Sequence, residues 1–225
     1  MIKAILWDND GVLSDTERLF FEANRRVLAD AGIDLTHADY VACFLEDNRG
    51  AWHLLRARGC GEAQVDAARR ARDACYARLL EQAAEARQVL SFPGVEAMLA
   101  RLAPRVAMSI VTASFAGHVA LAHRHGRVLD YIGSVFARED GLRAGLRPKP
   151  HPDCYLDALS RLGLRADECV AVEDSPRGLA AARAAGLRCI ALRSALLPDY
   201  AFQGAWRVVD GHAALERELD GLLAA

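Results

Sequence analysis

The sequence predicts an α/β fold in which helices cover both faces of a parallel sheet and a helical segment is inserted after the first strand. Short, almost continuously apolar segments recur along the chain, as in strands buried on both faces of a parallel sheet. Helix-sized intervals separate the later segments, whereas residues 16–88 show no strand pattern. The 225 residues exceed an average domain of ~150 residues by about half a domain, which leaves room for the insertion.

The first strand is expected at Ala4–Trp7, and it runs into the polar residues Asp8-Asn9-Asp10. In an open α/β sheet, ligands bind outside the carboxyl ends of the strands. Two carboxylates two residues apart in an extended segment share a side, with Cα atoms ~7 Å apart. By itself such a pair more often serves as a turn or a helix cap. At a strand end, however, one carboxylate could attack a substrate while the other moves protons.

Residues 16–88 are expected to form a small helical bundle. The segment is rich in Ala, Arg and Leu and is broken at Gly32, Gly59 and Gly61. Apolar residues recur in it at helical spacing, and we interpret them as its core: Phe20, Phe21, Val27, Leu28, Leu54, Leu55, Ala74, Leu79 and Leu80. The turn at Pro93-Gly94 then opens a helix over Val95–Leu102. The predicted domains are therefore residues 1–15 with 89–225, and residues 16–88.

The second strand is expected at Val106–Val111 and also ends in polar residues, Thr112-Ala113-Ser114. Hydroxyls and free backbone N–H groups at such an edge suit phosphate oxygens, although Thr112 and Ser114 considered alone are more often helix caps. A third strand is expected at Ser134–Ala137.

A lysine between prolines follows the third strand. Pro148 and Pro150 flank Lys149 and fix its backbone away from regular structure. The next helix has Pro152 at its start and Gly163 just past its end. A solvated lysine needs no such fixed backbone, so Lys149 is a candidate for the site.

The fourth strand is expected at Cys169–Val172 and leads directly into Glu173 and Asp174, before a helix that starts at Ser175-Pro176. These acids could simply complement the dipole of that helix. The last two strands are expected at Cys189–Leu192 and Arg207–Val209.

Together, these segments bring carboxylates, hydroxyls and one ammonium group to the same edge of the sheet. Hard oxygen ligands of this kind favour Mg²⁺, which often takes a substrate phosphate as a further ligand. An anionic nucleophile that approaches a phosphate dianion is repelled, and a divalent cation with a neighbouring lysine offsets this repulsion. The set therefore predicts chemistry on a phosphate group.

The ordered set of Asp8-x-Asp10-Gly11, Thr112, Lys149 and Glu173-Asp174 resembles the four motifs of the haloacid dehalogenase superfamily over essentially the full chain. The resemblance implies a Rossmann-like, doubly wound core with a helical cap of the β-phosphoglucomutase-like type at residues 16–88. It also implies that Asp8 is a nucleophile that forms an aspartyl-phosphate, that Asp10 is the general acid and base, and that the backbone carbonyl of Asp10 is a metal ligand. The predicted site residues are, for catalysis, Asp8, Asp10, Thr112 and Lys149; for substrate binding, Thr112, Ala113, Ser114, Lys149 and Arg49; and for Mg²⁺, Asp8, Asp10, Glu173 and Asp174.

The second acid, Asp10, favours phosphoryl transfer among the reactions of this superfamily, because a phosphate ester leaves as an alkoxide that needs a proton. The predicted function is a Mg²⁺-dependent phosphatase of small phosphorylated metabolites such as sugar or polyol phosphates. One alternative is a sugar phosphomutase, since Arg49 resembles a cap arginine of β-phosphoglucomutase that holds a second phosphate. An arginine on a helical surface is, however, more often simply exposed than a phosphate ligand, and Glu46 stands where this family often has Gly. Another alternative is a retired enzyme that binds a phosphometabolite as a regulator.

The composition bounds the partners and the location of the protein. With 28 Lys and Arg against 30 Asp and Glu, the net charge of -2 offers no field for nucleic acid or an anionic membrane. No apolar run approaches the ~20 residues of a membrane-spanning helix, and the six cysteines form no metal-ligand cluster. We therefore expect a cytoplasmic monomer or weak homodimer with reduced thiols. His123 and His125 are expected at the surface, and Asn9 receives no catalytic role.

Overall fold

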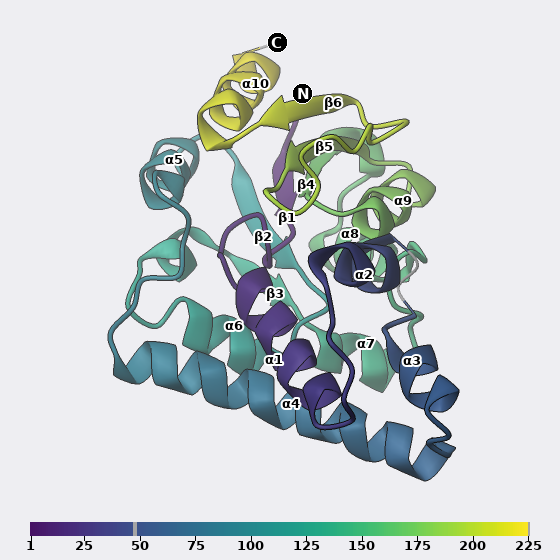
Figure 1. The fold of residues 1–225 in the computed structure, drawn as a ribbon. Coiled ribbons are helices and arrows are strands. Elements are labelled where there is room, and N and C mark those ends of the chain that lie inside the picture. Colours follow the sequence, from purple (N-terminus) through teal and green to yellow (C-terminus); the bar gives the residue numbers. More distant parts are fainter. Residues whose placement is uncertain (47–48, 225) are drawn as a thin grey trace.

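A six-stranded parallel sheet forms the centre of the computed structural model, which describes residues 1–46 and 49–224 (Figure 1). The strands lie in the order β3-β2-β1-β4-β5-β6. Their bounds are β1 (Ala4–Trp7), β2 (Ala107–Val111), β3 (Ser134–Phe136), β4 (Cys169–Glu173), β5 (Arg188–Arg193) and β6 (Arg207–Asp210). All six predicted strands are present and the predicted parallel α/β fold is confirmed, with strand ends shifted by one residue at most.

The strand order changes direction between β1 and β4, because successive strands are added on one side of β1 up to β3 and on its other side from β4 onward. β1 pairs with β2 on one side and with β4 on the other, so the first three strands build one half and the last three build the other. A ligand-binding crevice is expected at such a switch point, outside the carboxyl ends of the strands. The residues that follow β1, β2 and β4 are Asp8, Thr112 and Asp174.

Helices cover both faces of the sheet because successive strand residues point to opposite sides. Ile5 and Trp7 pack in one buried cluster with side chains of α5, α6 and α10, whereas Ala4 and Leu6 pack in another with α8 and α9. The helices of this part are α5 (Val95–Leu102), α6 (Ala116–Ala122), α7 (Arg138–Ala144), α8 (Asp153–Leu162), α9 (Pro176–Ala184) and α10 (His212–Ala224), with the 3-10 turns η2 (Val128–Tyr131) and η3 (Ala166–Glu168). The doubly wound arrangement is therefore confirmed.

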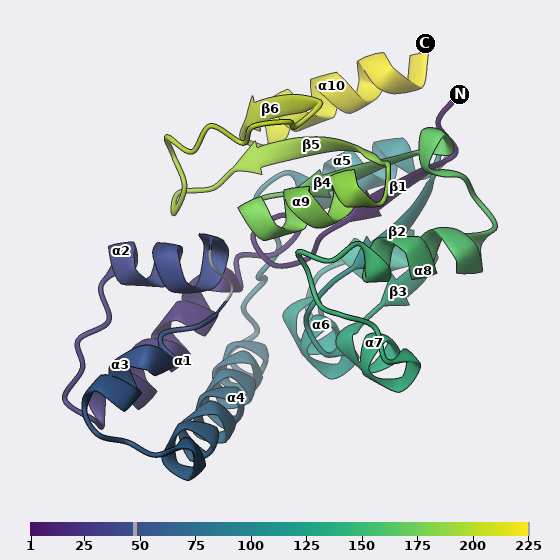
Figure 2. The same cartoon turned by 90° about the vertical axis from the view of Figure 1, so that its right-hand side faces the viewer.

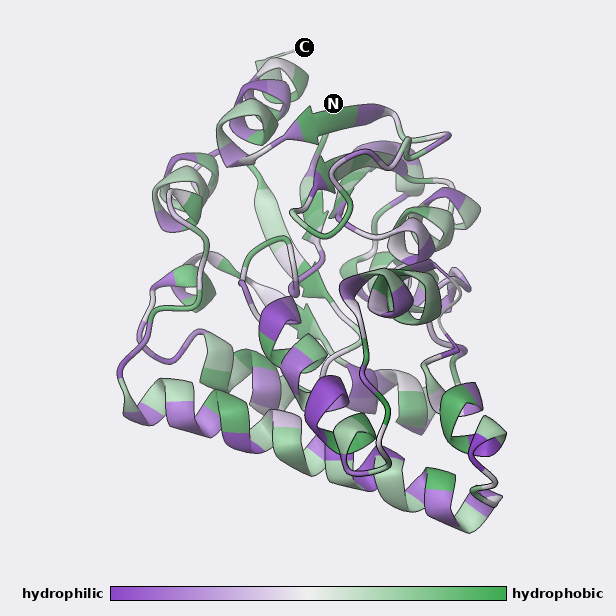
Figure 3. Ribbon diagram, in the orientation of Figure 1, coloured by the Kyte–Doolittle hydropathy of each residue, from purple (hydrophilic) through white to green (hydrophobic). Residues whose placement is uncertain are grey.

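Between β1 and α5, the described residues contain helices and no strand. These elements are α1 (Glu17–Ala29), α2 (His37–Tyr40), the π-helical η1 (Val41–Glu46), α3 (Trp52–Ala57) and α4 (Glu62–Glu85). Figure 2 shows them gathered beside the carboxyl ends of the strands. Leu19 of α1 packs with Cys75 and Leu80 of α4 in a cluster of their own, which fits the alternation of apolar and polar residues along α4 in Figure 3.

The inserted helices also pack against the sheet part of the protein. Leu28, Tyr40 and Leu55 share one buried cluster with Leu6 of β1 and Leu179 of α9. The hydrophobic core is thus continuous across the predicted boundaries at residues 15 and 88, and the division of the chain into two domains at these positions stays a prediction.

Two neighbouring connections join the inserted helices to the core. Ser14 and Ser91 pair as an isolated antiparallel bridge. The Asp15 N–H donates to the carbonyl of Leu90 at 2.8 Å, and the Phe92 N–H donates to that of Leu13 at 3.2 Å. The outgoing and returning segments therefore run side by side in opposite directions.

Across the described part of the chain, no helix has both the length and the apolar character that crossing a bilayer requires. Each of the six cysteines is buried or partly buried. Their reduced state stays a prediction.

Candidate active site

The loop after β1 turns sharply and brings Asp8 close to Asp174. The N–H groups of Leu13 and Ser14 both donate to the carbonyl of Asn9, at 2.9 and 3.0 Å. Gly11 has a φ of +83°, and a Cβ atom there would lie 2.0 Å from Oδ2 of Asp174. Only glycine tolerates both this conformation and this approach, so the fourth residue of the Asp-x-Asp-Gly motif makes room for the carboxylate that follows β4.

Lys149 lies buried among the strand ends. Its Nζ donates to Oδ1 of Asp8 at 2.7 Å, to Oε1 of Glu173 at 2.7 Å and to the carbonyl of Val111 at 2.9 Å. The Tyr155 hydroxyl donates to the same Oε1 of Glu173 at 2.6 Å. Burial lowers the pKa of Lys149, but Asp8 and Glu173 outweigh it and raise this pKa above its ordinary value. The ammonium group is therefore charged and fixed beside Asp8.

Asp10 accepts hydrogen bonds from two sides of the site. Its Oδ1 accepts from the hydroxyls of Thr16 at 2.5 Å and Tyr76 at 3.4 Å, and Tyr76 belongs to α4 of the inserted segment. Its Oδ2 accepts from the hydroxyls of Thr112 at 3.3 Å and Ser114 at 2.7 Å. Asp10 thus lies at the border of the core and the inserted helices.

Three carboxylates crowd at the ends of β1 and β4. One oxygen each from Asp8, Glu173 and Asp174 lies within 4.8 Å of the others, and all three residues are buried. Burial raises the pKa of Asp8 to about 7 against the attraction of Lys149. It raises the pKa of Asp174 well above its usual range, and the charges of Asp8 and Glu17 add to this effect. Lys149 and the partly buried Arg177 bring two positive charges to four acids, because Glu17 lines the same cavity as these three carboxylates. A hard divalent cation such as Mg²⁺ therefore fits this set of oxygen donors.

Glu173 is also tightly packed against the next helix. A Cβ atom on Gly178 of α9 would lie 1.8 Å from Oε2 of Glu173, and this oxygen has no hydrogen-bond partner among the described residues. The other carboxylate oxygen accepts from both Lys149 and Tyr155. Glu173 therefore both holds Lys149 in place and belongs to the cluster of buried acids.

A cavity of about 130 Å³ opens onto these groups. Arg72 of α4 lines it with a side chain that is 12% exposed. The guanidinium donates to Asp73 Oδ1 at 2.7 Å and to Asn24 Oδ1 at 3.2 Å, and its carbon lies 4.6 Å from the ring centre of Phe20. Arg72 and Tyr76 are four residues apart and share one helix face. The sequence spacing predicts that Arg72 and Tyr76 share a face of α4, but it does not predict that this face meets the core.

Most of the predicted site residues surround this one cavity. Those that line it are Asp8, Asp10, Thr112, Ala113, Ser114, Lys149, Glu173 and Asp174. Arg49 is exposed and is not among the described residues that line the cavity, so its part in substrate binding stays a prediction. Asp47 and Asn48, which precede it, lie outside the described residues.

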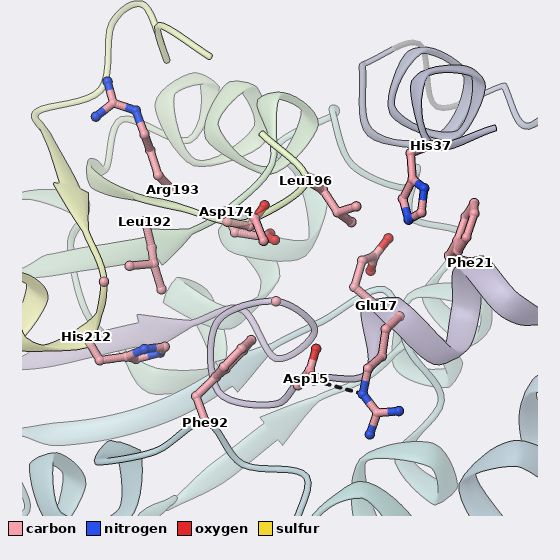
Figure 4. Close-up of a pocket in the computed structure, with 15 residues that line it drawn as sticks. Asp15, Glu17, Phe21, His37, Phe92, Asp174, Leu192, Arg193, Leu196 and His212 are labelled. Atoms are coloured by element: carbon pink, nitrogen blue, oxygen red, sulfur yellow. Dashed lines mark hydrogen bonds and ion pairs between the residues drawn. The ribbon is translucent and has the colours of Figure 1, made fainter. Parts of the chain in front are cut away.

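A larger cavity of about 360 Å³ lies next to the first connection to the inserted helices (Figure 4). Glu17 and Asp174 line both cavities. The walls of the larger one include Phe21 and His37 on one side and Phe92 on another. Its lining includes neither Lys149 nor Asp8 and Asp10, so the predicted phosphate site corresponds to the smaller cavity.

The prediction that His123 lies at the surface is wrong. The side chain is 3% exposed, and its Nε2 lies 2.7 Å from Oδ1 of Asn9. Burial lowers the pKa of His123 to about 4, so the ring is neutral near pH 7. His125 is exposed as expected, and its Nε2 lies 2.7 Å from the carbonyl of Ala84. The spacing of the two histidines excludes a shared metal site but does not reveal which of them faces the core.

Comparisons with known proteins agree with this arrangement. A family model described as haloacid dehalogenase-like hydrolase matches residues 2–186. Protein CbbY of Rhodobacter capsulatus is 31% identical over 98% of this chain and 99% of its own length. Hexitol phosphatase B of Escherichia coli K12 is 29% identical over 84% of this chain and 82% of its own length.

A solved structure shows the same fold. The β-phosphoglucomutase of Clostridium difficile superposes with a TM-score of 0.75 over all of both chains, at 18% identity. The family match covers β1 to α9 and thus every strand end that contributes to the small cavity. The chain therefore belongs to the haloacid dehalogenase-like hydrolase family.

Proposed function

We propose that the protein is a Mg²⁺-dependent phosphatase that hydrolyses small phosphorylated metabolites, such as sugar or polyol phosphates, through an aspartyl-phosphate on Asp8. The observation that carries the proposal is the position of Asp8, which lies between the ammonium group of Lys149 and the carboxylate of Asp174. Membership of a hydrolase family and the similarity to a hexitol phosphatase support it.

In the first step, a carboxylate oxygen of Asp8 forms a bond to phosphorus while the bond from phosphorus to the ester oxygen breaks. Asp10 gives its proton to the leaving alkoxide, which is otherwise a poor leaving group. In the second step, Asp10 takes a proton from a water molecule, whose oxygen attacks phosphorus and releases Asp8 and inorganic phosphate. In the structure the hydroxyls of Thr112 and Ser114 donate to Asp10 and the ammonium of Lys149 donates to Asp8. We propose that these groups donate to the phosphate oxygens when a substrate is bound.

The residues that would hold Mg²⁺ are Asp8 and Asp174, together with the backbone carbonyl of Asp10. When bound, the ion supplies positive charge that offsets the repulsion between the carboxylates and the phosphate. Since one oxygen of Glu173 accepts from both Lys149 and Tyr155, we propose that Glu173 orients the lysine. Its direct contact with the metal stays a prediction.

The phosphatase reaction is favoured over the two alternatives. The mutase alternative depended on Arg49 as the group that holds a second phosphate, and Arg49 is not among the described residues of the cavity, although Arg72, Arg138 and Arg177 are. A regulator without activity would not need a nucleophile candidate that is fixed by a buried lysine. Both alternatives can be tested with the same preparation.

The test is phosphate release from a panel of sugar, polyol and other phosphomonoesters, with Mg²⁺ and with EDTA. We expect Mg²⁺-dependent turnover in the wild type and none in Asp8→Asn, which keeps the shape of the side chain but removes the nucleophile. Inactivity across the panel would overturn the proposal, and binding of a phosphoester without turnover would favour the regulator. Conversion of a hexose 1-phosphate to its isomer in the presence of hexose bisphosphate would identify a mutase.

A further inference from the structure

A buried chain of hydrogen bonds connects His123 to Asp10. His123 Nε2 lies 2.7 Å from Asn9 Oδ1, and Asn9 Nδ2 lies 3.2 Å from Ser14 Oγ. Ser14 Oγ lies 3.0 Å from Thr16 Oγ1, which lies 2.5 Å from Asp10 Oδ1. The chain of hydrogen bonds therefore passes from the residue that follows α6, through the loop after β1, to the carboxylate at the border of the cavity.

With Asp10 as a carboxylate, which can only accept, the hydrogen bonds of this chain form one consistent series. The Thr16 hydroxyl donates to Asp10 and accepts from the Ser14 hydroxyl, whose oxygen also lies 3.3 Å from the carbonyl of Asn9. The Ser14 hydroxyl then accepts from the amide NH₂ of Asn9. The amide oxygen of Asn9 remains to accept from His123, whose Nε2 carries the proton. All the donors point toward Asp10, and hydrogen bonds aligned in this way polarise and strengthen one another.

The members of the chain are almost inaccessible to water. The exposed fractions of His123, Asn9, Ser14 and Thr16 are 3%, 1%, 0% and 0%. A buried polar group without a partner costs about 1–3 kcal/mol, so the loss of one member leaves its neighbour unsatisfied rather than hydrated. The side chains are thereby confined to one arrangement.

Thr16 stands at the start of α1, where a threonine hydroxyl ordinarily caps the helix. It is the N-cap residue of α1, and a threonine there usually accepts a hydrogen bond from the first turn of its helix. No such side-chain bond is present, and α1 begins without it. The hydroxyl is instead held between Ser14 and Asp10. The local preference of the helix start is thus overridden in favour of a contact with the candidate acid and base.

We propose that His123, Asn9 and Ser14 are positioning residues that hold the Thr16 hydroxyl on Asp10 and so orient its carboxylate for proton transfer. The proposal rests on the proposed phosphatase function. None of the three residues lines the catalytic cavity, so they act through Thr16 and not on the substrate. We therefore expect substitution of these residues to lower kcat and to leave KM nearly unchanged.

The first test compares two substitutions of His123. His123→Leu removes the donor to Asn9, whereas the amide of His123→Gln can replace it from a similar position. We expect kcat on a sugar phosphate to fall about tenfold in His123→Leu with KM within about twofold, and to recover to within about threefold in His123→Gln. Val119→Ala in α6, the helix that ends just before His123, is the control, because Val119 is also buried but has no polar group. Equal kcat losses in all three variants, or an unchanged kcat in His123→Leu, would overturn the proposal.

The second test does not depend on turnover. In a crystal structure of Asn9→Leu, we expect the Thr16 hydroxyl to leave Asp10 and to accept from an N–H group of the first turn of α1. Retention of the Thr16 to Asp10 contact in that variant would refute the positioning role, whatever the activity. If the wild type hydrolyses no phosphomonoester but Thr16 moves as expected, the proposed function fails while the structural link between Asn9 and Asp10 stands.

Discussion

At the scale of single residues, the site depends on charges and polar groups that are buried with their partners. Lys149 is 5% exposed and has oxygen partners from Asp8, Glu173 and Val111. Loss of one partner of a buried charge leaves the other uncompensated, which is far more costly than the pair itself. The sequence identified Lys149 because its flanking prolines make little sense for an exposed lysine. It did not identify Tyr155, whose position in α8 gives no polar signal.

Burial of His123 makes the protein less stable in acid, because the buried ring must be neutral. Its pKa is about 4 in the folded protein because of burial, against 6.5 for the free side chain. The unfolded chain therefore binds more protons between these values, so stability is fully present above pH 6.5 and is lost as the pH falls toward 4. We expect His123 to lower the free energy of unfolding by as much as about 3 kcal/mol over this window. Urea unfolding from pH 7 to pH 4 measures this loss, and His123→Gln is the control that should not show this part of it.

At the scale of elements, α4 brings the inserted segment into the catalytic cavity. Arg72 and Tyr76 lie on the face of this helix that meets the loop after β1. Periodicity predicted helices in this segment, but it could not predict their orientation, because α4 presents apolar side chains to more than one neighbour. The core residues were easier to predict, since the carboxyl ends of parallel strands always meet at one edge.

Arg72 is expected to contribute to substrate binding. Its guanidinium is fixed by Asn24, Asp73 and the ring of Phe20 at the wall of the cavity. Arg72→Ala should raise KM for the best substrate about tenfold, which corresponds to the loss of a hydrogen bond from a charged group. Steady-state kinetics measures the change. Arg69→Ala is the matched control on the same helix, because Arg69 pairs with Asp66 and does not line the cavity. Equal KM values for wild type and Arg72→Ala would contradict this role.

Two helical glycines should respond in opposite ways to alanine. Gly178 of α9 lies against Glu173, where a Cβ atom would lie 1.8 Å from Oε2, whereas Gly221 of α10 has open space around it. Gly178→Ala should lower the free energy of unfolding by about 2 kcal/mol or more, because the buried Glu173 must move. Gly221→Ala should raise it by about 0.5–1 kcal/mol through helix propensity. Chemical denaturation checks both values, and stabilisation by Gly178→Ala would show that Glu173 is not held as described.

At the scale of the whole molecule, the fold assembles an anionic site from distant parts of a chain with a net charge of only -2. Asp8 and Asp174 come from the ends of β1 and β4, which are neighbours in the sheet though far apart in sequence. The strands, the sheet edge and the order of the motifs were predictable because burial on both faces leaves a continuous apolar pattern. The buried hydrogen-bond partners of Asn9 could not be predicted, because hydrogen bonds between different elements produce no periodic pattern in the sequence.

The clustering of acids predicts that Mg²⁺ stabilises the protein. A ligand that binds only the folded state at 100 times its Kd adds about 2.7 kcal/mol, which for a chain of this size raises Tm by about 5–10 °C. Thermal unfolding with Mg²⁺ and with EDTA measures the shift. Asp174→Asn should lose most of it, whereas Asp66→Asn, an exposed acid of α4, should retain it. A full shift in Asp174→Asn would place the metal elsewhere.

The paired connections at Ser14 and Ser91 have a mechanical consequence. The inserted helices are tied to the core at both ends of the segment by the main-chain hydrogen bonds of Asp15 and Phe92. Helix α4 ends shortly before the second of these connections. The same pair of connections that closes the inserted segment therefore also fixes the end of the helix that carries Arg72 and Tyr76 next to the loop of Asp10.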